Sequence, residues 1–148
     1  MKNNYIKIEF SSLSENEGIA RQFVAAYAAL MDPTLEELAE IRTAVSEAVS
    51  NSIIHGYMGR ENGIIILEII KDDENKIYIT ITDEGKGISN VEEAMKPLYT
   101  TGNPDERAGM GFTVMESFMD NVKVNSKEGF GTKVTMTKKL GEKCGKEL

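Results

Sequence analysis

The chain has 148 residues, of which 41% are hydrophobic, and this size and composition fit one ordinary globular domain rather than two. Its formal net charge of −7 argues against a nucleic-acid surface, because neutralising phosphates requires clustered Lys and Arg. No apolar run is long enough for a membrane span and the start of the chain lacks the apolar core of a signal peptide, so we expect a cytoplasmic protein without a membrane partner.

The first third of the chain predicts a strand followed by a helix. Residues 5–10, "YIKIEF", alternate between apolar and polar side chains as a strand does. Residues 14–32 follow as a helix, in which large apolar side chains recur at helical spacing and predict the buried stripe: Ile19, Phe23, Tyr27 and Leu30.

A second, longer helix is predicted next, over residues 34–56. Thr34 and, three residues on, Glu37 form a capping box that begins it, and His55 with Gly56 is typical of a helix C-terminus. An apolar stripe along this helix predicts its buried face, which comprises Leu38, Ile41, Val45, Ala48 and Val49.

The remaining elements are mostly strands. Residues 63–71 and 77–83 predict a hairpin, and a short helix near 90–95 precedes a polar loop at 97–109. A helix over 110–120 and a last hairpin, with strands at 122–126 and 132–138, complete the pattern. These elements predict a two-layer α/β sandwich, with a mixed, mostly antiparallel sheet covered by helices on one face.

We expect a single domain over residues 1–140 and a frayed tail at 141–148. The tail holds the only cysteine, Cys144, so an internal disulfide is excluded. With one histidine in the chain, His55, a zinc site is also not expected.

The second helix carries a polar row. Glu47, Asn51 and His55 step by four residues, so they lie along one flank of the apolar stripe at the edge of the core. A solvated helix face, with His55 interacting favourably with the helix dipole, is the alternative interpretation.

The strand at 77–83 ends on an inward-facing acid. Period two places Asp83 on the same face as the isoleucines of "IYITITD", where an unpaired carboxylate is costly. A ligand that presents an amine beside an apolar face, such as a purine, would satisfy it. Gly85 and Gly87 let the backbone turn and allow a close approach, and Thr132 could add a hydroxyl to the same pocket.

The segment "AGMGFTVM" is the third candidate. Gly109 and Gly111 precede or open an apolar helix, whose free N–H groups and positive dipole end favour phosphate. In the loop before it, Thr100, Thr101 and Arg107 have the makeup of a lid. Arg107 could reach a terminal phosphate, although an exposed loop arginine is the alternative. The P-loop and eukaryotic kinase patterns are absent.

Taken in order, "SEAVSNSIIHG", "DEGKGI" and "GMGF" followed by "GT" resemble the ATP-binding boxes of the GHKL superfamily, which includes gyrase and the histidine kinases. The resemblance extends over nearly the whole chain and is strongest to the small bacterial serine kinases that are anti-sigma factors. It implies that Asn51 binds Mg²⁺, that Asp83 reads adenine and that Glu47 is the catalytic base. His55 lies inside the first box, Gly87 matches the second, and the third contributes three residues: Gly109, Gly111 and Phe112.

The resemblance also implies a function. ATP would phosphorylate a serine of an anti-anti-sigma factor, a sporulation sigma factor would be the sequestered partner, and the nucleotide state, ATP or ADP, would decide between them. A homodimer is implied as well. Two alternatives remain open: a non-catalytic, ATP-gated sigma-binding module, which retention of Glu47 disfavours, and the ATPase half of a sensor histidine kinase, for which we find no phosphoacceptor helix.

Overall fold

The computed structural model of the chain describes residues 4–96 and 108–141. Five strands form one sheet in the order β1-β2-β3-β5-β4, and each neighbouring pair is antiparallel. The strands are β1 (Ile6–Ser11), β2 (Ile64–Lys71), β3 (Lys76–Asp83), β4 (Asn121–Lys127) and β5 (Gly131–Lys139). The sheet is therefore more uniform than the mixed, mostly antiparallel sheet expected from the sequence.

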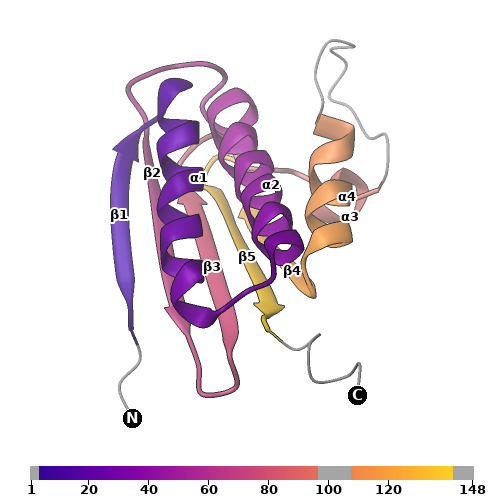
Figure 1. Cartoon of the computed structure of the whole chain (residues 1–148). Coiled ribbons are helices and arrows are strands. Elements are labelled where there is room, and N and C mark those ends of the chain that lie inside the picture. Colours follow the sequence, from indigo (N-terminus) through magenta and orange to yellow (C-terminus); the bar gives the residue numbers. More distant parts are fainter. Residues whose placement is uncertain (1–3, 97–107, 142–148) are drawn as a thin grey trace.

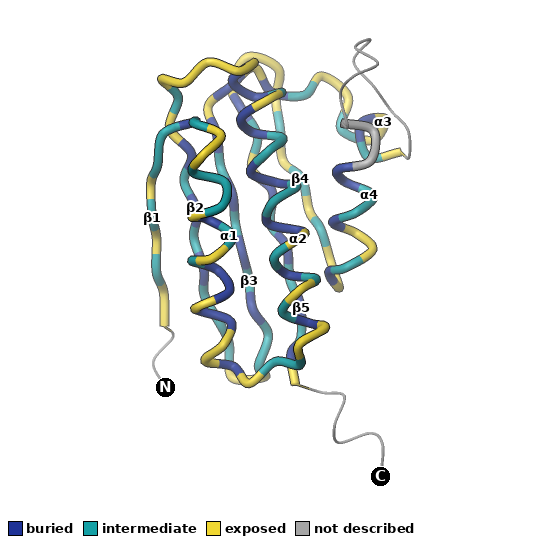
Figure 2. The backbone as a smooth tube through the Cα atoms, turned by 45° about the horizontal axis from the view of Figure 1, so that its top comes forward, coloured by how far each residue is buried: buried dark blue, intermediate teal, exposed yellow. Residues whose placement is uncertain are grey.

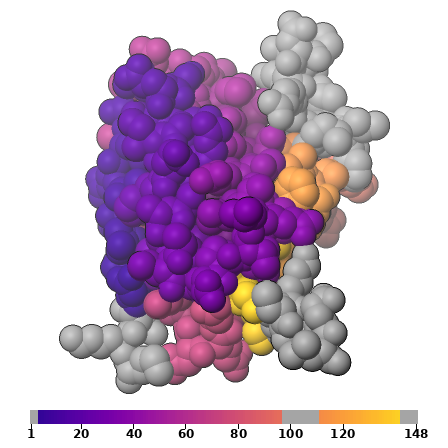
Figure 3. All heavy atoms as spheres, viewed as in Figure 1, coloured from indigo at the N-terminus to yellow at the C-terminus, as the bar shows by residue number. Residues whose placement is uncertain are grey.

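Three helices cover one face of this sheet, as Figure 1 and the space-filling view in Figure 3 show. They are α1 (Glu15–Ala28), α2 (Leu35–Asn51) and α4 (Ala108–Phe118). The shorter helical pieces are η1 (Ala29–Met31), η2 (Ser52–Gly56) and α3 (Val91–Ala94). The predicted two-layer α/β sandwich is confirmed. No helix in the described ranges is long and apolar enough to span a membrane.

The core lies between the helices and the sheet (Figure 2). Alternate residues of the two central apolar strands are fully buried and face the helices: Ile65, Leu67, Ile69, Ile77, Ile79 and Ile81. Burial of this kind contributes about 25 cal/mol per Å² of apolar surface and is the main term that holds the two layers together.

The predicted buried stripe of α1 is wrong in part. Ile19 and Leu30 are each 64% exposed. The helix instead turns a neighbouring row toward the core, and this row consists of Ala20, Val24, Tyr27, Ala28 and Met31. Its small residues allow α1 to pack closely against α2 and the sheet, which explains why they face inward although the larger side chains have the same spacing.

The second helix begins as predicted and ends differently. Both hydrogen bonds of the capping box between Thr34 and Glu37 are present. The α-helix ends at Asn51, and the chain continues to Gly56 as a π-helix, in which the N–H of Tyr57 donates to the carbonyl of Ser52 at 2.8 Å. Short π-helical turns of this kind are frequent at functional sites.

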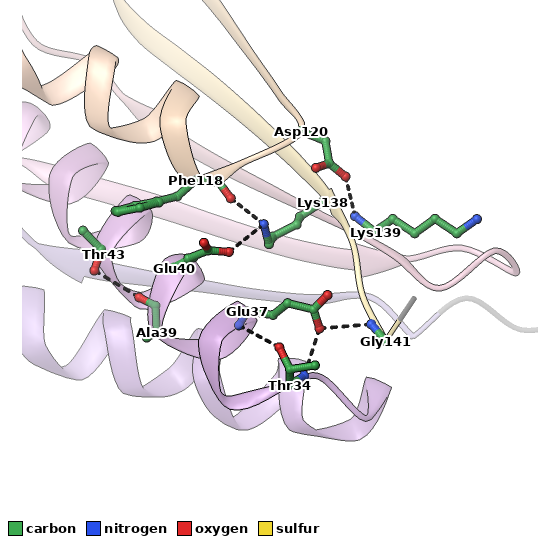
Figure 4. Close-up of polar contacts among 10 residues, drawn as sticks. All are labelled: Thr34, Glu37, Ala39, Glu40, Thr43, Phe118, Asp120, Lys138, Lys139 and Gly141. Atoms are coloured by element: carbon green, nitrogen blue, oxygen red, sulfur yellow. Dashed lines mark hydrogen bonds and ion pairs between the residues drawn. The ribbon is translucent and has the colours of Figure 1, made fainter. Parts of the chain in front are cut away.

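Polar contacts at the start of α2 tie it to the end of β5 (Figure 4). Oε1 of Glu37 accepts from the N–H of Thr34 at 2.9 Å and from the N–H of Gly141 at 3.0 Å. Nearby, the buried ammonium of Lys138 donates to the carbonyl of Phe118 and pairs with Glu40 at 3.0 Å, which joins β5, α4 and α2.

We expect Thr34→Ala to lower the free energy of unfolding by about 1 kcal/mol, because the N–H of Glu37 loses its acceptor. Urea denaturation followed by circular dichroism measures this loss. Thr34 lies at the opposite end of α2 from Asn51, so nucleotide affinity should not change, and a variant as stable as the wild type would contradict the role of the cap.

Candidate nucleotide site

A cavity of about 200 Å³ opens beside the end of α2. Its walls come from six parts of the chain: the α2–η2 segment, the end of β3 with the loop after it, α3, α4, the β4–β5 turn, and β5. The predicted site residues that line it are Asn51, His55, Asp83, Gly87, Phe112 and Thr132. Three motifs far apart in the sequence are therefore brought together, and the loop residues Ile88 and Ser89 line the cavity with them.

Asp83, the last residue of β3, is buried as period two predicts and is 4% exposed. Its Oδ2 accepts from the hydroxyl of Ser52 at 2.8 Å, and its Oδ1 accepts from the N–H of Gly85 at 2.9 Å. Burial raises the pKa of the Asp83 carboxyl, while these hydrogen bonds and one from the backbone of Thr132 act in the opposite direction.

The glycines after Asp83 permit close backbone contacts within the protein. A Cβ on Gly85 would stand 2.1 Å from the carbonyl oxygen of Gly56. Gly87 has a φ of +76°, and a Cβ there would stand 2.1 Å from the carbonyl oxygen of Lys127. The loop therefore packs directly on η2 and on the end of β4, and these contacts hold Gly87 against the cavity that it lines.

Asn51 and α4 meet at the opposite wall. A Cβ on Gly111 would stand 2.9 Å from Nδ2 of Asn51 and 3.1 Å from its Oδ1, so the asparagine amide lies against the first turn of α4. Gly109 lies in the same turn. Unpaired N–H groups at such a helix start attract phosphate.

We expect Gly111→Ala to weaken binding of Mg-ATP about tenfold, because the new methyl group displaces the Asn51 amide. The fold should not suffer, since alanine is favoured over glycine in a helix by about 0.5–1 kcal/mol. Calorimetric titration and a thermal melt measure the two effects. Wild-type ATP affinity in this variant would show that the position of Asn51 does not matter.

The residues present fit a magnesium ion held mainly by phosphates. No group of three or more His, Cys, Asp or Glu able to hold a metal occurs in the part of the chain that the structure describes. Mg²⁺ characteristically takes few protein ligands and keeps phosphate and water oxygens around it, and the Asn51 amide at the start of α4 can supply one oxygen.

Glu47 does not line this cavity. It lies one helical turn before Asn51, on a separate polar hollow of about 720 Å³ between α1 and α2. The hollow also contains Arg21, Arg42 and Ser46. The predicted row Glu47–Asn51–His55 is thus divided between two depressions, and Thr100, Thr101 and Arg107 lie outside the described residues.

Ser52 and Gly56 lie inside the first box, but the sequence pattern does not single them out as site residues. Ser52 holds one oxygen of Asp83, and a Cβ on Gly56 would stand 3.0 Å from the Asp83 Cγ. Both belong to η2, and their contacts with Asp83 join positions that are 31 and 27 residues apart in the sequence, respectively. Only the adjacency of Ser52 to Asn51 could have suggested it.

The chain matches the model of the histidine kinase-like ATPase domain over residues 10–138. The anti-sigma F factor of Clostridium beijerinckii is 54% identical over 140 residues, covering 95% of this chain and 97% of that protein. The anti-sigma F factor of Caldanaerobacter subterraneus is 56% identical over 139 residues, covering 94% and 96%. The chain therefore belongs to the histidine kinase-like ATPase family and, within it, to the family of the anti-sigma F factors.

Solved structures show the same fold at low sequence identity. The RsbU and RsbW domains of Rv1364c from Mycobacterium tuberculosis match with a TM-score of 0.68 and 18% identity, over 93% of this chain and 32% of that chain. The mycobacterial sensor histidine kinase MprB matches with a TM-score of 0.59 and 13% identity, over 90% and 100%. The predicted GHKL fold is confirmed, and ATP binding is the property that this family implies.

Proposed function

We propose that the chain is an ATP-dependent protein serine kinase and an anti-sigma factor, which sequesters a sporulation sigma factor of the sigma F type and phosphorylates a serine of its anti-anti-sigma factor. The observation that carries the proposal is the single cavity at which Asn51, Asp83 and Phe112 meet. The relatives named anti-sigma F factors support the choice of partner. We place this activity in the cytoplasm and in a homodimer.

Adenine would enter the cavity with its amino group toward Asp83. The carboxylate accepts hydrogen bonds, which suits an amine, and Ile88 and Val134 supply apolar wall for the ring. The phosphates would then extend toward the first turn of α4, where Asn51 lies. Mg²⁺ bound there with Asn51 as a ligand would neutralise phosphate charge.

Glu47 would serve as the general base. Its carboxylate takes the proton of the incoming serine hydroxyl while the serine oxygen attacks the γ-phosphorus in line and the bond to the ADP oxygen breaks. The polar hollow that Glu47 lines gives the partner serine an approach separate from the nucleotide cavity. Phosphoserine and ADP are the products.

The test is incubation of the chain with γ-labelled ATP, Mg²⁺ and an anti-anti-sigma factor, followed by mapping of the label. We expect the label on one serine of the anti-anti-sigma factor. When the chain is omitted, the anti-anti-sigma factor should carry no label. ATP-dependent binding of the partner without any transfer would overturn the kinase assignment and favour the non-catalytic module.

A further inference from the structure

Ser52 lies inside the first box, yet the resemblance assigns its side chain no role. It is the first residue of η2, directly after Asn51, and is 5% exposed. Its hydroxyl donates to Oδ2 of Asp83 at 2.8 Å. A hydrogen bond to a buried carboxylate is a strong one, so this contact constrains the acid that reads the ligand.

The protein itself uses about half of the hydrogen-bond acceptor capacity of Asp83. A carboxylate offers about four lone-pair positions. The Ser52 hydroxyl takes one on Oδ2, and the N–H of Gly85 takes one on Oδ1. Gly56 packs against the carboxylate, since a Cβ there would lie 3.0 Å from Cγ. About two acceptor positions then remain, and a ligand in the cavity can use them.

We propose that Ser52 is a positioning residue that sets purine specificity. By donating to Oδ2, it holds Asp83 as a fixed, acceptor-only group, so that the cavity selects a purine nucleotide with a 6-amino group over one with a 6-oxo group. The inference rests on the proposed function only in that the ligand is a purine nucleotide.

The two purine classes respond differently to loss of the hydroxyl. A 6-amino purine needs an acceptor in a fixed place, whereas a 6-oxo purine presents an oxygen that a fixed carboxylate repels. Without Ser52 the carboxyl can turn, and a turned or protonated carboxyl tolerates the oxo group. The other titratable side chains of the cavity, His55, Lys86 and Glu128, are unaltered and act on both ligands alike.

The experiment is calorimetric titration of the full chain with ADP and with IDP, without magnesium. For Ser52→Ala we expect ADP affinity to fall about tenfold, while IDP affinity stays equal or rises. The preference for ADP over IDP therefore falls about tenfold or more. Ser52→Thr restores the hydroxyl and should restore the preference.

Ser12→Ala is the matched control. Ser12 is also buried, at 1% exposure, and its hydroxyl donates to the carbonyl of Arg60 at 2.6 Å, away from the cavity. This variant should keep the wild-type ratio of ADP to IDP affinity even if it melts earlier. If Ser52→Ala does not fold, Ser52→Cys gives the same comparison with a weaker donor of similar size.

An unchanged ratio in Ser52→Ala, or an equal loss for both nucleotides, would overturn the inference and leave Ser52 a structural residue. If the wild type transfers no phosphate, yet Ser52→Ala still changes its ratio of ADP to IDP affinity, the kinase proposal fails and the purine-specificity inference stands. A wild type that binds neither nucleotide refutes both.

Discussion

Asp83→Asn is expected to lower the affinity for ADP and ATP by about 100-fold, the largest effect on binding that the cavity predicts. The N–H of Gly85 requires an oxygen at the Oδ1 position, so the amide nitrogen takes the place of Oδ2 beside Ser52. A donor then stands where the purine amine also donates. Calorimetric titration measures the loss.

The same substitution should raise the melting temperature of the nucleotide-free protein at neutral pH. Burial raises the pKa of the Asp83 carboxyl, so the carboxyl binds a proton more readily in the folded chain than in the unfolded chain. The protonated Asp83 carboxyl therefore contributes to stability below the ordinary pKa of an aspartate, and this contribution is lost as pH rises through the raised pKa of the folded state. Removing the charge therefore stabilises the folded protein at pH 7.

Thermal melts across a pH series measure this effect on stability. The gain in melting temperature should shrink toward acidic pH, where Asp83 is protonated in the wild type as well. A variant that binds ADP normally would show that the buried acid does not contact the ligand.

Glu47→Gln should reduce phosphate transfer by about 100-fold to 10,000-fold, because glutamine keeps the size of the side chain but cannot take a proton. Binding of Mg-ATP and of the sigma factor should persist, since Glu47 does not line the nucleotide cavity. Single-turnover assays with labelled ATP measure the rate. Asn51→Ala is the contrast, and it should weaken binding and transfer together.

Transfer at a near wild-type rate by Glu47→Gln would remove the base assignment. A second variant in the same hollow, Thr43→Ala, tests whether any change to the lining of the hollow lowers the transfer rate. Thr43 is exposed and its hydroxyl donates to the carbonyl of Ala39 within the helix at 3.0 Å, so its loss should leave the transfer rate unchanged.

Local patterns predicted the parts of the site that depend on period and chain direction. Alternation along β3 placed Asp83 inward, and it is 4% exposed. The capping box fixed the start of α2, because both of its partners are close in sequence. The order of the elements and their pairing into hairpins followed from the same short-range signals.

Features that depend on tertiary packing were not predictable. In α1 two adjacent rows are apolar, and helical spacing cannot tell which one faces the sheet, so Ile19 was placed inward although it is 64% exposed. The helical spacing predicts that Glu47, Asn51 and His55 lie along one flank of α2. Residues four apart drift by about 40° around an α-helix, and the π-helical turn after Asn51 alters the phase again. Glu47 and His55 therefore line different depressions.

The central claim is that three separate motifs form one adenine-nucleotide site, and chemical-shift mapping of the ¹⁵N-labelled chain during titration with Mg-ADP tests it most directly. The largest amide shifts should fall together on Asn51, Gly85, Gly87 and Phe112, around the one cavity that these segments share, and should be absent in Asp83→Asn. Shifts confined to the hollow between α1 and α2, or equal shifts in the variant, would contradict the account.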